Sequence, residues 1–177
     1  MGLARVLLIA LLVLSLAPVA ASQGRRVVDV VNAGDAASER EHDYAGEGAT
    51  AGVIDGRAYR QARGWLSYAM AVYDDTEVTL TCVFRGTEGR SLAFDLLVDG
   101  RPVKTRTVVP PSSLPAIVDL RIPFEITKGL TAIRVMLRAV DGPTPPLLEL
   151  RTVQEHLERQ PFAGRPARVP GLPGLTF

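Results

Sequence analysis

Aromatic side chains and planar polar side chains gather in one stretch of the sequence, between residues 39 and 68. A sugar-binding site uses flat rings to cover the C–H surface of the sugar. It uses guanidinium, carboxylate and imidazole groups to hydrogen bond the hydroxyls. The stretch holds both kinds of group, with Glu39 and Asp43 as carboxylates. The candidate ligand-binding residues are His42, Tyr44, Arg57, Tyr59, Arg60, Trp65 and Tyr68.

The same residues also fit a purely structural interpretation. Trp65 and Tyr68 would then fill a hydrophobic core, and Arg57 and Arg60 would pair with carboxylates of the preceding loop. Because neighbouring side chains of a strand point to opposite faces, Trp65 and Tyr68 cannot lie on the same face of one strand. At most one of the two rings is therefore expected to face the centre of a sandwich.

No catalytic constellation is visible in the sequence. His42 and His156 lie far apart and in no metal-ligand spacing, and Cys82 lies on the apolar face of an expected strand, where a thiol behaves as a small apolar group. Motifs for a serine nucleophile, a phosphate loop or a dinucleotide are absent. Glycoside hydrolysis needs two carboxyl groups about 5 to 9 Å apart, a distance that the sequence does not supply. We therefore expect no enzyme activity of its own, no cofactor and no metal.

The N-terminus has the order of a secretory signal peptide: Arg5, an apolar run from Val6 to Leu16, and small residues ending at Ala21. The apolar run of about 11 residues is shorter than the roughly 20 that span a bilayer. We expect cleavage after Ala21 and a secreted or periplasmic protein with no membrane segment in its mature form. Cleavage after Ser22 and an uncleaved N-terminal anchor are the alternatives.

Composition narrows the classes of partner. The chain has 20 basic and 19 acidic residues, so it gives no reason to expect nucleic acid or an anionic membrane surface as a partner. A single cysteine excludes an intramolecular disulfide. The acidic residues at 74–77 raise the question of a calcium ion, and a solvated turn between two strands explains them better.

Apolar residues alternate with period two along most of the chain, which predicts strands. Asp99-Gly100 predicts a type I′ turn between two of them, because both central residues of that turn need positive φ. We expect an all-β antiparallel β-sandwich of the jelly-roll or galactose-binding-like type with about eight strands. The expected strands lie at 27–31, 65–72, 78–84, 92–98, 103–107, 116–122, 133–139 and 147–153.

The expected domain organisation follows from these segments. Residues 1–21 are a signal peptide, 22–28 a linker, 29–153 the sandwich, and 154–177 a Pro- and Gly-rich disordered tail. The segment Asn32 to Gly56 is expected to be a long loop without a helix, since each of its glycines costs about 1 kcal/mol in a helix interior. Gly64 to Val72 is expected to form the first long strand.

Several short blocks also occur in a characteristic order. They are Asp29-Val30-Val31, His42 before the Gly-rich 46–52, Gly56-Arg57-Ala58-Tyr59-Arg60-Gln61-Ala62, Gly64-Trp65-Leu66-Ser67-Tyr68, Phe94-Asp95-Leu96-Leu97-Val98-Asp99-Gly100 and Thr127-Lys128-Gly129. On these blocks, residues 29 to 153 resemble the β-sandwich accessory domain that follows the catalytic barrel in bacterial β-L-arabinofuranosidase-type glycoside hydrolases. Leu66 stands where that domain has an aromatic residue, and Asp43 where it has asparagine.

The resemblance implies a sandwich fold and a substrate-binding role without the catalytic barrel, so hydrolase activity is not implied. The expected function is a secreted, non-catalytic carbohydrate-binding module. Its expected partners are a carbohydrate, such as an arabinose-containing polysaccharide, and a glycoside hydrolase. The alternative is a structural or protein-interaction β-sandwich with no sugar ligand.

Overall fold

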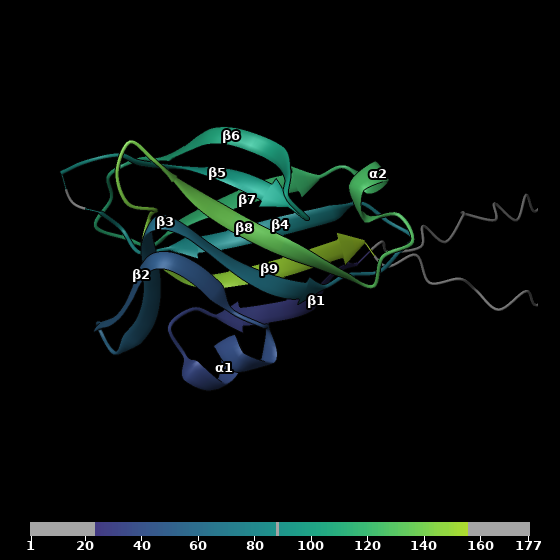
Figure 1. Ribbon diagram of the computed structural model, residues 1–177, viewed down its shortest axis with the longest axis horizontal. Helices are drawn as coiled ribbons and strands as arrows, with labels where there is room; N and C mark the ends of the chain where they lie inside the picture. The colour runs from purple at the N-terminus through teal and green to yellow at the C-terminus, as the bar shows by residue number, and fades with distance from the viewer. Residues whose placement is uncertain (1–23, 88, 156–177) are drawn as a thin grey trace, which may run out of the picture.

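The computed structural model describes residues 24–87 and 89–155, which form nine strands and two short helices (Figure 1). The elements are β1 Arg25–Asn32, α1 Ala36–Glu41, β2 Ala45–Ile54, β3 Arg57–Ala71, β4 Val78–Phe84, β5 Leu92–Val98, β6 Arg101–Val109, β7 Ala116–Ile122, α2 Phe124–Thr127, β8 Ala132–Val140 and β9 Leu147–Glu155.

The strands form two antiparallel layers. One layer has the order β2-β3-β8-β5-β6, and the other has the order β1-β9-β4-β7. The layers join at one corner, where Arg60 of β3 pairs with Leu147 of β9. The all-β antiparallel sandwich expected from the sequence is therefore confirmed.

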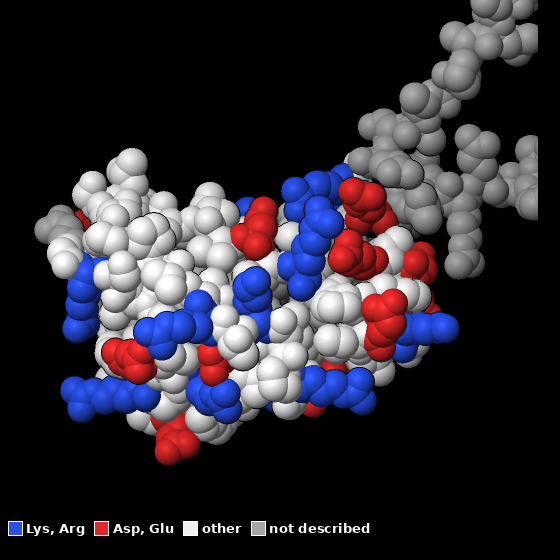
Figure 2. All heavy atoms as spheres, turned by 90° about the horizontal axis from the view of Figure 1, so that it is seen from above, with Lys and Arg blue, Asp and Glu red and all other residues white. Residues whose placement is uncertain are grey.

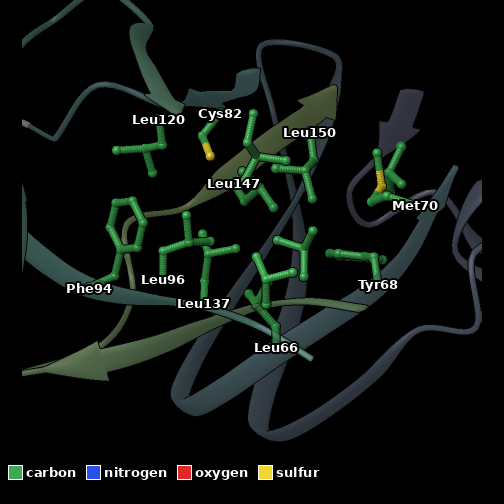
Figure 3. Close-up of a cluster of buried hydrophobic side chains, with 14 of the residues drawn as sticks. Leu66, Tyr68, Met70, Cys82, Phe94, Leu96, Leu120, Leu137, Leu147 and Leu150 are labelled. Carbon is green, nitrogen blue, oxygen red and sulfur yellow. The ribbon is translucent and has the colours of Figure 1, made fainter. Parts of the chain in front are cut away.

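The core lies between the two layers (Figure 3). On β3, Leu66, Tyr68 and Met70 are fully buried, as the alternation predicts for one face. Side chains of β4 and β9 face them from the opposite layer, and the rings of Phe84 and Phe94 lie 5.2 Å apart. Burial of a large apolar side chain contributes about 1.5–3 kcal/mol, so this cluster is the main source of stability for the sandwich.

Two Asp-Gly turns connect neighbouring strands. Asp99 and Gly100 have φ of 47° and 76° and join β5 to β6, so the predicted turn is confirmed. Asp55 and Gly56 have φ of 50° and 74° and join β2 to β3 in the same way. This second hairpin was not expected, although its sequence carries the same signal.

The prediction of a long loop without a helix from Asn32 to Gly56 was wrong, because the segment contains α1 and β2. Asp35 caps α1 by accepting a hydrogen bond from the Ser38 amide at 2.8 Å, which satisfies one of the unpaired amides of the first turn. β2 is rich in glycine, but it pairs with β3 along its length and absorbs Gly48 in a bulge. Tertiary pairing thus overrides the low strand propensity of glycine.

The limits of the strands also differ from expectation. The stretch around Trp65 is not the first long strand, because β2 of ten residues precedes it; it belongs to β3, which begins at Arg57. β1 begins at Arg25, inside the expected linker, and β9 continues to Glu155, inside the expected tail. Buried Gln154 of β9 holds the loop after β3 through bonds to the amide and carbonyl of Tyr73.

The expected signal peptide and most of the expected tail lie outside the described residues. Within residues 24–87 and 89–155, neither helix has the length or the apolar composition needed to cross a bilayer.

Candidate functional site

The seven candidate residues lie in three separate places. The first group surrounds α1 and consists of His42, Tyr44, Arg60 and Tyr68. Trp65 lies on the outer face of the five-stranded layer. Arg57 and Tyr59 lie at one end of the sandwich. That end, here called the loop end, carries the turn at 55–56 and the loops that follow β4, β6 and β8. In Figure 1 it lies on the left, opposite the side where β1 begins and β9 ends.

Glu39 of α1 is the centre of a buried polar cluster. Only 5% of the residue is exposed. Arg60 donates to both carboxylate oxygens, through Nε at 2.9 Å and through Nη2. The Gly34 amide donates to Oε1 at 2.8 Å, and the Tyr68 hydroxyl donates to the same oxygen at 3.0 Å. The carboxylate of Glu39 therefore ties α1 to β3, because two of its three donors, Arg60 and Tyr68, belong to that strand.

The charges of this cluster stabilise one another. Burial raises the pKa of Glu39, but the hydrogen bonds from Arg60 and Gly34 outweigh it and hold the pKa below its usual value. Burial and the neighbouring carboxylate raise the pKa of Tyr68 far above its ordinary value. The Arg60 guanidinium lies 4.5 Å from the centre of the Tyr44 ring, and that ring lies 5.4 Å from the Tyr68 ring.

This arrangement matches the structural interpretation of Arg60 and Tyr68. Tyr68 has no exposed surface, so its ring cannot cover a sugar in this conformation. Only 17% of the Arg60 side chain is exposed, and its guanidinium is engaged by Glu39. We assign these two residues, together with Tyr44, to holding α1 on the sandwich.

His42 makes the second attachment of α1. Its Nδ1 lies 2.6 Å from the Ser38 carbonyl oxygen, and its Nε2 lies 3.0 Å from Oδ1 of Asp29 on β1. Asp29 also accepts from the Ala71 amide of β3 at 2.7 Å. Because both ring nitrogens face acceptors, the charged imidazolium fits the site best. Burial alone would lower the pKa of His42. The hydrogen bonds to Ser38 and Asp29 have a larger combined effect in the opposite direction, so the pKa is raised above its ordinary value.

We predict a pH dependence from this pair. A pKa raised above the ordinary 6.5 means that the stabilisation by His42 is complete below about pH 6.5 and is lost as pH rises through the higher folded value. The wild-type protein should therefore exceed His42→Gln in free energy of unfolding by more at about pH 5.5 than at about pH 8.5. Urea denaturation of both proteins at the two pH values measures this. A difference that stays constant or grows with pH would contradict the assignment.

Trp65 lies apart from both the α1 cluster and the loop end. Its indole Nε1 donates to Glu47 Oε2 of β2 at 2.9 Å, at an exposed position. Its partner across the sheet on β8 is Arg138, which is bound to Asp95 of β5 at 2.7 Å. Hydrogen bonds from the Arg106 amide and from Arg138 lower the pKa of Asp95. Trp65 thus belongs to a polar row across the outer face and not to a site with the other aromatic candidates.

Two cavities lie at the loop end. One, of about 390 Å³, is lined by Tyr59, Gln61, Arg85, Thr87, Arg90, Leu92 and Pro146. The other, of about 360 Å³, is lined by Ile54, Asp55, Arg57, Arg85, Gly86, Ser113, Pro115 and Leu148. Both volumes fall within the range of about 300–1,000 Å³ that is usual for small-molecule sites. Arg85 lines both cavities, so the two are neighbours.

The candidates Arg57 and Tyr59 are thus brought to a site that the sequence placed elsewhere. Arg85, Arg90, Gln61 and Ser113 were not predicted as site residues. Arg85 directly follows β4, and Arg90 comes just before β5, so both stand at strand ends. That position was the available signal, because loops at the end of a rigid scaffold carry binding residues more often than strand interiors do.

Close backbone packing supports the loop end. The Tyr59 ring rests against Gly52 of β2, where an added Cβ would come within 2.5 Å of ring atoms. Gly86 packs against the backbone of the β6–β7 loop, and the Ser112 amide donates to the Thr87 carbonyl at 3.1 Å. The two loops that border the second cavity are therefore joined by backbone contact.

Neither nucleophilic catalysis by a thiol nor metal binding is supported by the part of the chain that the structure describes. Cys82 is fully buried, and burial raises the pKa of its thiol far above the ordinary value, so it is not a reactive nucleophile. Across residues 24–87 and 89–155, no group of three or more His, Cys, Asp or Glu side chains is arranged to hold a metal ion.

The protein is an antiparallel β-sandwich with two open, polar cavities between the loops at one end. A family model described as a family of unknown function, DUF6805, matches residues 24–153. The chain belongs to the DUF6805 family. No curated protein matches it.

Several solved structures share this fold. A family 35 carbohydrate-binding module from Clostridium thermocellum is 10% identical, with a TM-score of 0.51, and the match covers 73% of this chain and 97% of that one. The corresponding module from Paenibacillus barcinonensis is 10% identical, with a TM-score of 0.53, over 70% and 96%. An exo-β-1,3-galactanase from Phanerochaete chrysosporium is 10% identical, with a TM-score of 0.52, over 70% of this chain and 28% of its own. At such identities the likeness concerns the fold alone.

Proposed function

We propose that the chain is a secreted, non-catalytic carbohydrate-binding module whose sugar site is the loop end. The observation that carries this proposal is the pair of neighbouring cavities that share Arg85. They offer an aromatic ring from Tyr59, guanidinium groups, and the hydroxyl and amide groups of Ser113 and Gln61. These are the groups that hold sugar rings and hydroxyls. The shared fold of the family 35 modules supports the same function.

The proposal also covers the polysaccharide that is bound, the partner enzyme and the location of the protein. The order of short blocks in the sequence favours a role beside a glycoside hydrolase of the β-L-arabinofuranosidase type, with an arabinose-containing polysaccharide among its targets. The apolar N-terminus favours secretion or a periplasmic location. In this proposal Arg57 and Tyr59 keep their ligand role, and Arg85, Arg90 and Gln61 are added to it.

Calorimetric titration with arabinan- and galactan-derived oligosaccharides tests the proposal. Tyr59→Ala and Arg85→Ala should each weaken binding by about tenfold or more, since one lost stacking or charge-assisted contact is worth about 1.5 kcal/mol or more. Tyr59→Phe should bind nearly as the wild type does, because it keeps the ring. The matched control is Arg101→Ala, which removes an exposed arginine at the opposite end of the sandwich.

The absence of binding at millimolar ligand across these sugars and a wider glycan array would contradict the proposal. Co-purification with a protein partner under that outcome would favour the interaction module instead. Equal loss of affinity in Arg101→Ala and Arg85→Ala would show that the loop end is not the site.

A further inference from the structure

The loop end concentrates positive charge on an otherwise balanced molecule. The whole chain carries a formal net charge of +1, and basic and acidic side chains are interspersed over the face shown in Figure 2. Arg90 lines the first loop-end cavity, Arg57 lines the second and Arg85 lines both. Asp55 is the one acidic residue among their described linings. Three guanidinium groups around two neighbouring cavities create a positive local potential, which attracts an anionic ligand.

Within the described part of the chain, acidic side chains neutralise little of this positive charge. Arg57 lies 3.9 Å from Glu149 Oε2, a long contact with half of the arginine side chain exposed, and Arg151 occupies the other oxygen of the same carboxylate. Among the described residues, the guanidinium groups of Arg85 and Arg90 form no hydrogen bond or ion pair. They contrast with Arg60, whose guanidinium is held by Glu39.

A neutral sugar would leave these charges uncompensated, whereas an anionic group would pair with them. The planar guanidinium forms two parallel hydrogen bonds to a carboxylate and is preferred where oxyanions are bound. Gln61 already donates through Nε2 to the Thr144 carbonyl at 2.8 Å, and the Thr87 hydroxyl donates to the Arg90 carbonyl at 2.9 Å. Their side-chain oxygens can still accept from sugar hydroxyls, and the Ser113 hydroxyl lines the second cavity. The Tyr59 ring supplies a surface for the sugar face.

We propose that the loop end selects a glycan that bears an anionic group, a carboxylate or a sulfate ester, and that Arg85 contacts this group from between the two cavities. This inference rests on the proposed function and specifies its ligand. The anionic group is expected at the shared wall of the cavities, with the sugar ring toward Tyr59. Arg57 and Arg90 flank it from either side.

Calorimetric titration with three probes tests the proposal: an oligogalacturonide, the same oligomer after reduction of its carboxyl groups, and a sulfated galactan oligosaccharide without uronic acid. We expect at least one anionic probe to bind tenfold or more tightly than the reduced oligomer. Higher salt should weaken this binding. Arg85→Ala should abolish the preference, Arg85→Lys should retain part of it, and Arg101→Ala should leave it unchanged. The two anionic probes distinguish a carboxylate from a sulfate.

The outcomes separate this inference from the proposed function. Equal binding of the reduced and acidic oligomers would overturn the anion preference and leave sugar binding intact. Failure of all probes, together with the neutral arabinan and galactan oligosaccharides, would overturn both. An anion preference that Arg101→Ala lowers as much as Arg85→Ala does would show nonspecific charge attraction and overturn the site. If Arg85→Ala does not fold, as judged by circular dichroism, Arg90→Ala replaces it with the same expectations.

Discussion

Glu39→Ala is expected to lower the free energy of unfolding by about 3–5 kcal/mol, the range found when one partner of a buried ion pair is removed. The substitution leaves the Arg60 guanidinium largely buried without its carboxylate. It also leaves the Tyr68 hydroxyl and the Gly34 amide without their acceptor. Each orphaned polar group adds a desolvation cost of about 1–3 kcal/mol. Such a loss is a large fraction of the total stability of a domain of this size.

Urea denaturation monitored by tryptophan fluorescence measures this effect. Glu41→Ala is the matched control, since Glu41 lies on the same helix and is exposed, and a change below about 0.5 kcal/mol is expected there. Glu39→Gln should fall between the two, because the amide keeps one acceptor but turns a donor toward Arg60. If Glu39→Ala costs no more than Glu41→Ala, the cluster does not hold α1 to the sandwich.

Period-two patterns were sufficient to predict the sandwich and to group Leu66, Tyr68 and Met70 on one face of β3, but not to show that this face is the inward one. Leu66, Tyr68 and Met70 are spaced two apart, and a strand buried on one face requires that spacing. The turn at Asp99-Gly100 was equally local, since its two residues alone define the required φ. Patterns of this kind depend on neighbours in sequence, so a single chain displays them directly.

The roles of the charged residues depended on contacts that the sequence does not display. Glu39 and Arg60 are 21 positions apart, and their pairing exists only because α1 folds back on β3. The same charged and aromatic types serve a sugar site or a buried anchor, and only burial distinguishes the two. Arg57 and Arg85 line one cavity because the β2–β3 turn and the β4–β5 loop meet at one end of the sandwich. Which loops are neighbours follows from the strand order, which residue spacing alone does not specify.

Gly86→Ala is the second substitution with a large expected effect, and it acts on stability and on the proposed site together. A Cβ at residue 86 would come within 2.6 Å of the Leu114 carbonyl oxygen and closer still to the Ser112 carbonyl oxygen. Both are backbone atoms, so no side-chain rotation relieves the clash and the β4–β5 and β6–β7 loops must separate. Overpacking that forces backbone shifts costs about 1–3 kcal/mol, and we expect the upper end here.

The separation of these loops should also weaken ligand binding by about tenfold or more, because a lost contact of about 1.4 kcal/mol corresponds to tenfold in affinity. Arg85 and Ser113 line the same cavity from the two loops, so moving the loops apart changes the distance between groups that must hold one ligand. Gly24→Ala is the matched control, since a Cβ there meets no atom within 4 Å. Thermal melting and calorimetric titration are measured on both variants. Unchanged melting in Gly86→Ala would show that the loops yield easily, and unchanged affinity with lowered melting would place the sugar site away from the second cavity.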